Sequence, residues 1–169
     1  MDNAFSTILG IGIAGILLIG VPMLAMAERN DDVAQQVVQS VTDDFAYSVV
    51  DEGKITEDNY SKYIDELGDT MHTFDVEMEV KHLDENIGNK SSWTSSSVVG
   101  ENSTISVHTA TIEDSLKEKG SYNLKSNDQL TVTATNTDTT MAQSFRNIWY
   151  RVSGKGTYSM KAQKTVTVP

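Results

Sequence analysis

The sequence predicts an α+β fold in which one long N-terminal helix packs against a small antiparallel sheet. An uncharged apolar run opens the chain and continues into an amphipathic helical pattern, and four later segments alternate apolar and polar residues. At 169 residues the chain has room for one modest domain plus an appendage. We therefore expect an N-terminal membrane and assembly helix over residues 1–50 and an α+β globular head over residues 51–169.

The apolar run extends from Ile8 to Ala27 and contains no charged residue. As a helix, roughly 20 residues cross about 30 Å, which is the hydrocarbon thickness of a bilayer. The run is rich in small residues, and Gly10 with Ala14 forms a small-x-x-x-small pair that permits close helix approach. The predicted membrane and assembly residues are Ile8, Gly10, Ala14, Gly15, Leu18, Gly20 and Leu24.

Three interpretations of this run compete. The ending Ala25-Met26-Ala27 suits a signal peptidase, but the residues before the run include Asp2 and no Lys or Arg, whereas a secretory signal starts positively charged. Retention is therefore favoured over cleavage after Ala27. A retained segment is either a lone anchor or a helix that packs against copies of itself.

The amphipathic segment follows without a glycine or proline after Pro22, which predicts one helix from about Phe5 to Val50, bent near Pro22. Within it, apolar residues recur every four positions. The residues expected to pack this helix on the head are Val33, Val37, Val41 and Phe45.

The head begins after Gly53, which is expected to end the long helix. Thr56 is the expected N-cap of a short helix that runs to Gly68, with an apolar stripe of Ile55, Tyr60, Tyr63, Ile64 and Leu67. A second short helix ends at Gly120, and a third is expected within residues 139–154.

Four segments carry the alternation of a half-buried strand: residues 74–83, 104–110, 129–136 and 158–168. Each has one apolar and one polar side. This pattern suits an antiparallel sheet that covers a helix on one face and meets water on the other.

Composition and motifs exclude several classes of function. A net charge of -11 repels nucleic acid, and the absence of cysteine excludes disulfides and thiolate metal sites. No nucleotide-binding, zinc or EF-hand motif is present. The three histidines, His72, His82 and His108, lack a nucleophile-elbow motif and are expected to be exposed. We expect no catalytic residue, cofactor or metal.

Two segments carry a resemblance to a known family: GKITEDNYSKYIDELGDTMHTFDVEMEVKHLDEN and TNTDTTMAQSFRNIWYRVSGKGTYSMKAQ. They resemble small membrane-anchored proteins of Gram-positive bacteria, similar to the TadE-like minor pilins of tight-adherence pilus systems. The resemblance covers most of the chain. Unlike ordinary type IV pilins, the apolar run has no acidic residue, so prepilin-peptidase processing is not expected.

The resemblance implies a structural subunit of a type IV pilus-like filament at the bacterial surface, and it does not imply an enzyme. It implies a homo-oligomer held by the N-terminal helices, a membrane location before assembly, and assembly machinery of the tight-adherence type. Two alternatives stay open. One is a monomeric, membrane-anchored binding module whose loop around Trp93 contacts a ligand, and the other is a soluble domain secreted after cleavage at Ala27.

Overall fold

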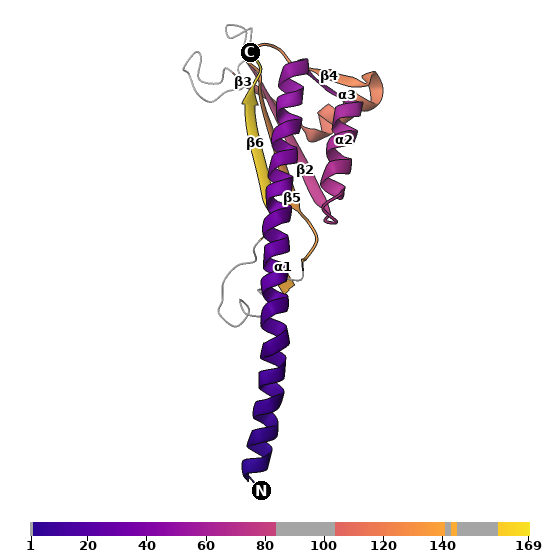
Figure 1. Cartoon of the computed structure of the whole chain (residues 1–169). Coiled ribbons are helices and arrows are strands. Elements are labelled where there is room, and N and C mark those ends of the chain that lie inside the picture. Colours follow the sequence, from indigo (N-terminus) through magenta and orange to yellow (C-terminus); the bar gives the residue numbers. More distant parts are fainter. Residues whose placement is uncertain (1, 84–103, 141–142, 145–158) are drawn as a thin grey trace, which may run out of the picture.

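A computed structural model describes residues 2–83, 104–140, 143–144 and 159–169 (Figure 1). The elements, in chain order, are α1 (Asp2–Glu52), β1 (Lys54–Thr56), α2 (Glu57–Gly68), β2 (Phe74–Leu83), β3 (Thr104–His108), α3 (Thr109–Lys119), β4 (Ser121–Asn123), β5 (Gln129–Asn136) and β6 (Lys161–Thr167). This arrangement confirms the α+β class.

Helix α1 is a single element of 51 residues that passes through Pro22 without a break (Figure 1). It ends where expected, because Gly53 adopts a φ of 66°, a left-handed conformation that favours glycine. Only the second half of α1 lies against the head, and the first half extends beyond it as a stem (Figure 1).

Strands β3, β2, β5 and β6 form one antiparallel sheet in that order, which confirms the predicted antiparallel arrangement. The longest pairing joins β2 to β5, from Phe74 opposite Asn136 to Lys81 opposite Gln129. The structure also contains a two-stranded ribbon of β1 and β4, which was not predicted and whose strands are only three residues each. Strands this short carry too few residues to show alternation.

The core lies between one face of the sheet and helices α1 and α2. Phe45 of α1 stacks on Tyr63 of α2, with ring centroids 4.4 Å apart and planes 6° from parallel. Burial of these two apolar surfaces stabilises the helix pair. The fully buried residues around this contact are Val38, Ala46, Val49, Ile55, Met78, Val80, Leu130, Val132 and Ala134.

The predicted packing stripe of α1 is wrong at its first two positions. Val33 and Val37 are exposed by 53% and 41%, whereas Val41 is half-buried against the core and Phe45 is buried. A four-residue spacing drifts by about 40° per step around a helix, so Val33 lies about 120° from Phe45. The face that meets the sheet instead follows Val38, Thr42, Phe45 and Val49.

Smaller details of the head also bear on the predictions. The predicted Thr56 cap is confirmed, since its hydroxyl accepts from the Asn59 amide at 3.2 Å and Thr56 N–H donates to the Asn59 side chain at 2.9 Å. Ile64, expected in the stripe of α2, is instead exposed by 40%. Gly120 ends α3 as predicted. Trp93 lies outside the described residues. Of the third helix expected within residues 139–154, only 139–140 and 143–144 are described, and 143–144 are helical.

Candidate functional site

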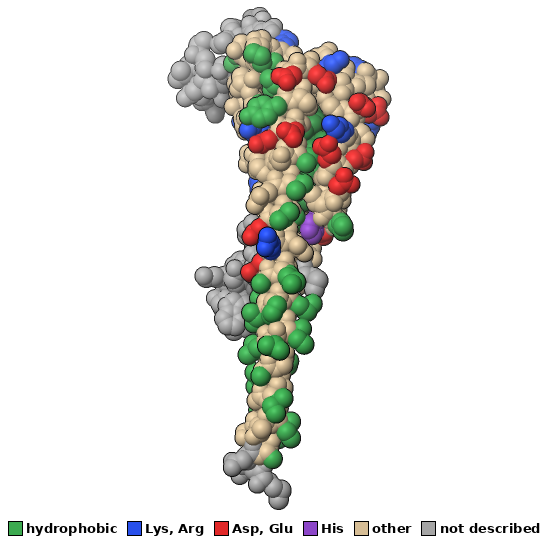
Figure 2. Space-filling view, in the orientation of Figure 1, with side chains coloured by type: hydrophobic (Ala, Val, Ile, Leu, Met, Phe, Trp, Pro, Cys, Tyr) green, Lys and Arg blue, Asp and Glu red, His purple; other side chains and the backbone are tan. Residues whose placement is uncertain are grey.

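The most unusual surface of the described chain is the bare stem. Large exposed apolar side chains occur along it from Phe5 to Met26, and Leu18 is exposed by 78%. At about 100° per residue their positions surround the helix, and Figure 2 shows one face of them. The most apolar 18-residue stretch of α1 is long and apolar enough to cross a membrane, and none of it is buried within the chain. Such a segment suits either a membrane anchor or a signal sequence.

The predicted assembly residues all lie on the stem but do not share one face. At about 100° per residue, Gly10 and Ala14 lie close together, whereas Gly15 and Gly20 point in other directions. A methyl group added at Gly10, Gly15 or Gly20 would meet no atom within 4 Å. Within the described part of the chain, no neighbouring atom therefore requires glycine at these positions.

Exposed apolar side chains recur on α1 beyond the stem, after the exposed polar residues Glu28, Arg29 and Asn30. Val33 and Val37, which the sequence analysis assigned to the interior, are both turned outward on the part of α1 that carries the head. At 1.5 Å per residue they lie roughly 9 and 15 Å beyond Ala27, the end of the uncharged run. Val33 and Val37 therefore lie beyond the roughly 30 Å hydrocarbon core that the run from Ile8 to Ala27 spans.

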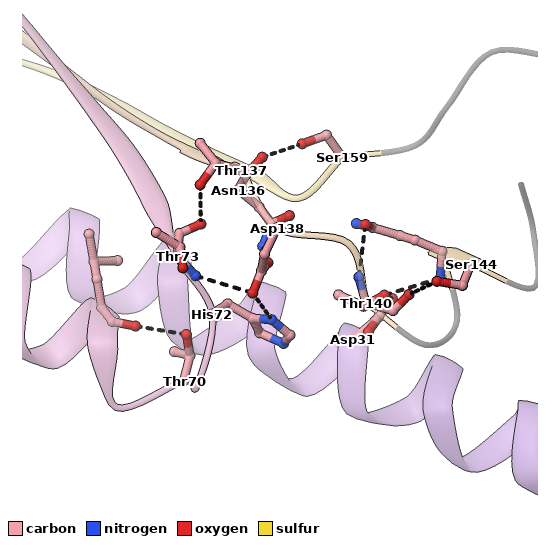
Figure 3. Close-up of polar contacts among 12 residues, drawn as sticks. Asp31, Thr70, His72, Thr73, Asn136, Thr137, Asp138, Thr140, Ser144 and Ser159 are labelled. Carbon is pink, nitrogen blue, oxygen red and sulfur yellow. Dashed lines mark hydrogen bonds and ion pairs between the residues drawn. The ribbon is translucent and has the colours of Figure 1, made fainter.

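A buried carboxylate marks the point where the stem meets the head. Asp31 of α1 is only 5% exposed and accepts a hydrogen bond of 2.8 Å from the Thr140 hydroxyl (Figure 3). Thr140 also forms a reciprocal cap with Gln143, because its hydroxyl accepts from the Gln143 amide and its own amide donates to the Gln143 side chain, both at 3.1 Å. The loop after β5 is thus tied to α1.

A second carboxylate holds the same loop to the start of β2. Asp138 accepts hydrogen bonds from the Asn136 side chain, from Nδ1 of His72 at 3.2 Å and from the Thr73 amide at 3.4 Å (Figure 3). Burial alone would raise the pKa of Asp138, but the hydrogen bonds from Asn136, His72 and Thr73 together lower the pKa below its usual value of 3.8. Together, Asp31 and Asp138 form what we call the neck.

At the opposite end of the sheet, His82 is partly buried, contrary to the expectation of exposed histidines. Its Nδ1 lies 2.7 Å from the Asp128 carboxylate, which is 1% exposed, and its Nε2 bonds the Tyr122 hydroxyl. Burial and the nearby Asp128 charge raise the pKa of Tyr122, which makes its hydroxyl a poorer nucleophile. These two hydrogen bonds, which join Asp128, His82 and Tyr122, link β2, β4 and the turn before β5. Periodicity did not reveal it, because its three residues come from separate segments.

A shallow groove lies between α2 and α3, with a volume of about 350 Å³. Its floor includes Tyr60, whose hydroxyl donates to Glu113 at 2.9 Å. Burial and this carboxylate raise the pKa of Tyr60. The lining residues are Glu57, Tyr60, Ser61, Ile64, Glu113, Leu116 and Lys117. Among the described residues, no group of three or more His, Asp or Glu side chains is placed to hold a metal ion.

Comparison of the chain with protein-family models, with curated proteins and with solved structures found no match. The functional interpretation therefore depends on the geometry of the stem, the neck and the head.

Proposed function

We propose that this chain is a structural subunit of a type IV pilus-like extracellular filament of a bacterium, assembled through its hydrophobic N-terminal helix. Before assembly, the stem holds the chain in the cell membrane with the head outside. In the filament, stems of neighbouring copies pack together and the heads lie outward. Assembly machinery of the tight-adherence type would draw the subunits from the membrane.

The observation that carries the proposal is the length of the exposed apolar surface on α1. A lone anchor needs apolar exposure only across the bilayer, which the run from Ile8 to Ala27 already provides. Val33 and Val37 are exposed beyond that run, at a height where a lone anchor meets water or headgroups. Helix packing between copies gives these two residues an apolar partner.

Charge favours an axial offset between neighbouring copies. Helix α1 has one basic residue, Arg29, whereas exposed acids such as Asp32 and Asp44 flank the Val33–Val37 surface. Parallel copies in the same register would place like charges side by side, which is unfavourable. An offset of at least roughly 15 Å, or ten helical residues, instead places both Val33 and Val37 beside a neighbour's uncharged stem.

The proposal is tested by placing charge on the exposed apolar surface above the membrane. We expect the double variant Val33→Asp, Val37→Asp to insert and fold normally but to form no filaments in electron micrographs of surface material. The matched control is Ile105→Asp, since Ile105 of β3 is also an exposed apolar residue, at 56%, but lies away from α1. Filaments of normal abundance in the double variant would refute packing through this surface.

A second candidate function is a monomeric, membrane-anchored surface binding module. The groove between α2 and α3 favours it, because apolar side chains of Ile64 and Leu116 lie there beside the Glu57 and Glu113 carboxylates. Micrographs separate the two functions directly, since a binding module gives dispersed particles with the wild-type sequence. Under that outcome, Ile64→Asp rather than Val33→Asp would impair function.

A further inference from the structure

The outer strand β6 has its free edge closed by side chains of α1. Among the described strands, β6 is an edge of the four-stranded sheet and pairs only with β5. On its other side, the Gln35 side chain bonds both backbone groups of Lys161: Nε2 donates to the carbonyl at 3.0 Å, and Oε1 accepts from the amide at 3.2 Å. A side-chain amide here makes the pair of bonds that a neighbouring strand would make.

The closure repeats one turn further along α1. Gln39 donates from Nε2 to the Gln163 carbonyl at 3.5 Å. Four helical residues rise about 6.0 Å and two strand residues about 6.6 Å, so side chains four apart on α1 nearly match alternate residues of β6. The mismatch of about 0.6 Å per step agrees with the longer second contact. At the next turn, Asp43 bonds the Lys164 ammonium at 3.5 Å instead of the backbone.

The inner strand β2 shows the same device where β3 leaves it uncovered. Pairing between β2 and β3 runs only from Glu79 to Leu83 on β2. At Met78, the next residue, the Thr109 hydroxyl takes the place of a strand, accepting from the Met78 amide at 2.7 Å and donating to the Met78 carbonyl at 3.3 Å. Side chains thus make hydrogen bonds to the outward backbone groups on both sides of this sheet.

We propose that Gln35 and Gln39 guard the edge of β6 against strand addition by a second copy of this chain. Exposed edge strands are templates for pairing with another chain, and proteins protect them with side chains or covering segments. The segment KAQKTVT of β6 contains apolar and β-branched residues that suit such pairing. The inference stands whether or not the stem builds a filament, because Gln35, Gln39 and β6 all lie beyond the stem, where α1 packs on the sheet.

The test compares variants of the full chain in detergent micelles by sedimentation over a range of concentrations. We expect Gln35→Ala with Gln39→Ala to strengthen self-association on the order of tenfold over wild type, since the freed backbone groups gain new partners. The matched control is Gln36→Ala with Ser40→Ala, which removes two exposed side chains from the same helix. Adding Gln163→Pro to the first variant should restore the wild-type value, because proline removes an outward amide that edge pairing requires.

If Gln35→Ala with Gln39→Ala associates no more strongly than the control variant, the proposed guard is wrong. It is also wrong if this double variant associates more strongly and the addition of Gln163→Pro does not reverse the increase. Circular dichroism verifies folding of each variant. If the double variant fails to fold, Gln39→Ala alone provides the same comparison with a smaller increase. Association through the stem is common to every variant, so its absence would count against the filament and leave the guard's test intact.

Discussion

The two halves of α1 have the same secondary structure but opposite surroundings. The second half buries Val38, Phe45 and Val49 against the sheet and α2, and its exposed faces carry charged residues together with Val33 and Val37. The first half carries exposed apolar side chains around its circumference, and no residue of its most apolar stretch is buried within the described chain. Figure 2 shows one face of this stem. Helix length and propensity therefore do not distinguish the halves. What distinguishes them is burial: the sheet and α2 bury one face of the second half, whereas no residue in the most apolar stretch of the first half is buried within the described chain.

The boundary between the halves is sharp, and it lies within a few residues of the neck. Glu28 and Arg29 are exposed charges that end the apolar run, and Asp31 is already buried against Thr140. Because a buried carboxylate needs a hydrogen-bonding partner, the loop after β5 fixes where the head begins. Variants that change one half of α1 at a time test whether the two halves behave independently.

Removal of residues 1–27 should give the largest effect. The head keeps its core, since every residue of that core lies at or beyond Val38. We expect complete loss of membrane retention and a folded, soluble chain, because the only described segment able to cross a bilayer is gone. Cell fractionation with circular dichroism of the soluble product measures both. A truncated chain that still sediments with membranes would show that the head supplies its own anchor.

Phe45→Ala tests the internal partner and should lower the free energy of unfolding by about 3 to 5 kcal/mol. The Phe45 ring is 5% exposed and stacks on Tyr63, so truncation leaves a cavity in the core. Leu18→Ala is the matched control in the stem, where we expect a change within about 0.5 kcal/mol. Urea unfolding in detergent, followed by tyrosine fluorescence of the head, compares the two. Equal losses would mean that stem and head unfold as one unit.

Asp31→Ala should destabilise the head by about 1 to 3 kcal/mol, because it leaves the Thr140 hydroxyl without this acceptor at a buried site. The neighbouring Asp32 is exposed, so Asp32→Ala should change the free energy of unfolding by less than about 0.5 kcal/mol. The same urea experiment measures both variants. If Asp31→Ala and Asp32→Ala lower the free energy of unfolding by the same amount, the neck does not fix the start of the head.

Much of this fold could be predicted from the sequence where a pattern is long. The alternation over residues 74–83 and 129–136 gave β2 and β5 correctly, and Gly53 and Thr56 marked helix ends that the structure confirms. The packing face of α1 was only half right. A helix that is apolar on two sides offers two stripes, and the sequence contains no sign of which side the sheet covers.

The polar links of the head were beyond sequence reasoning for a related reason. Asp31 bonds a residue 109 positions away, and Asp128 meets His82 across 46 positions. Such pairs depend on how loops converge once the sheet has formed, which local periodicity does not encode. The Gln35 and Gln39 contacts with β6 are different, because four-residue spacing of glutamines on a helix is visible beforehand. The sequence does not show, however, that β6 is the strand that these glutamines contact.

Acidification should give the smallest effect and act at the neck. Because hydrogen bonds lower the pKa of Asp138 in the folded chain, its ionised form stabilises the fold at pH values above about 3.8, and this contribution is lost as the pH falls further. Its side chain is 37% exposed, so solvent screening limits the contribution to a few tenths of a kcal/mol, roughly the value of a surface ion pair. Asp138→Asn should therefore be slightly less stable than wild type at pH 7 and nearly equal to it at pH 2.5. As a control, Asp65 lies on the exposed side of α2. The difference in urea midpoint between Asp65→Asn and wild type should not shrink between pH 7 and pH 2.5. A difference between Asp138→Asn and wild type that stays constant with pH would mean that the geometry of the loop, rather than the charge of Asp138, holds the head to the stem.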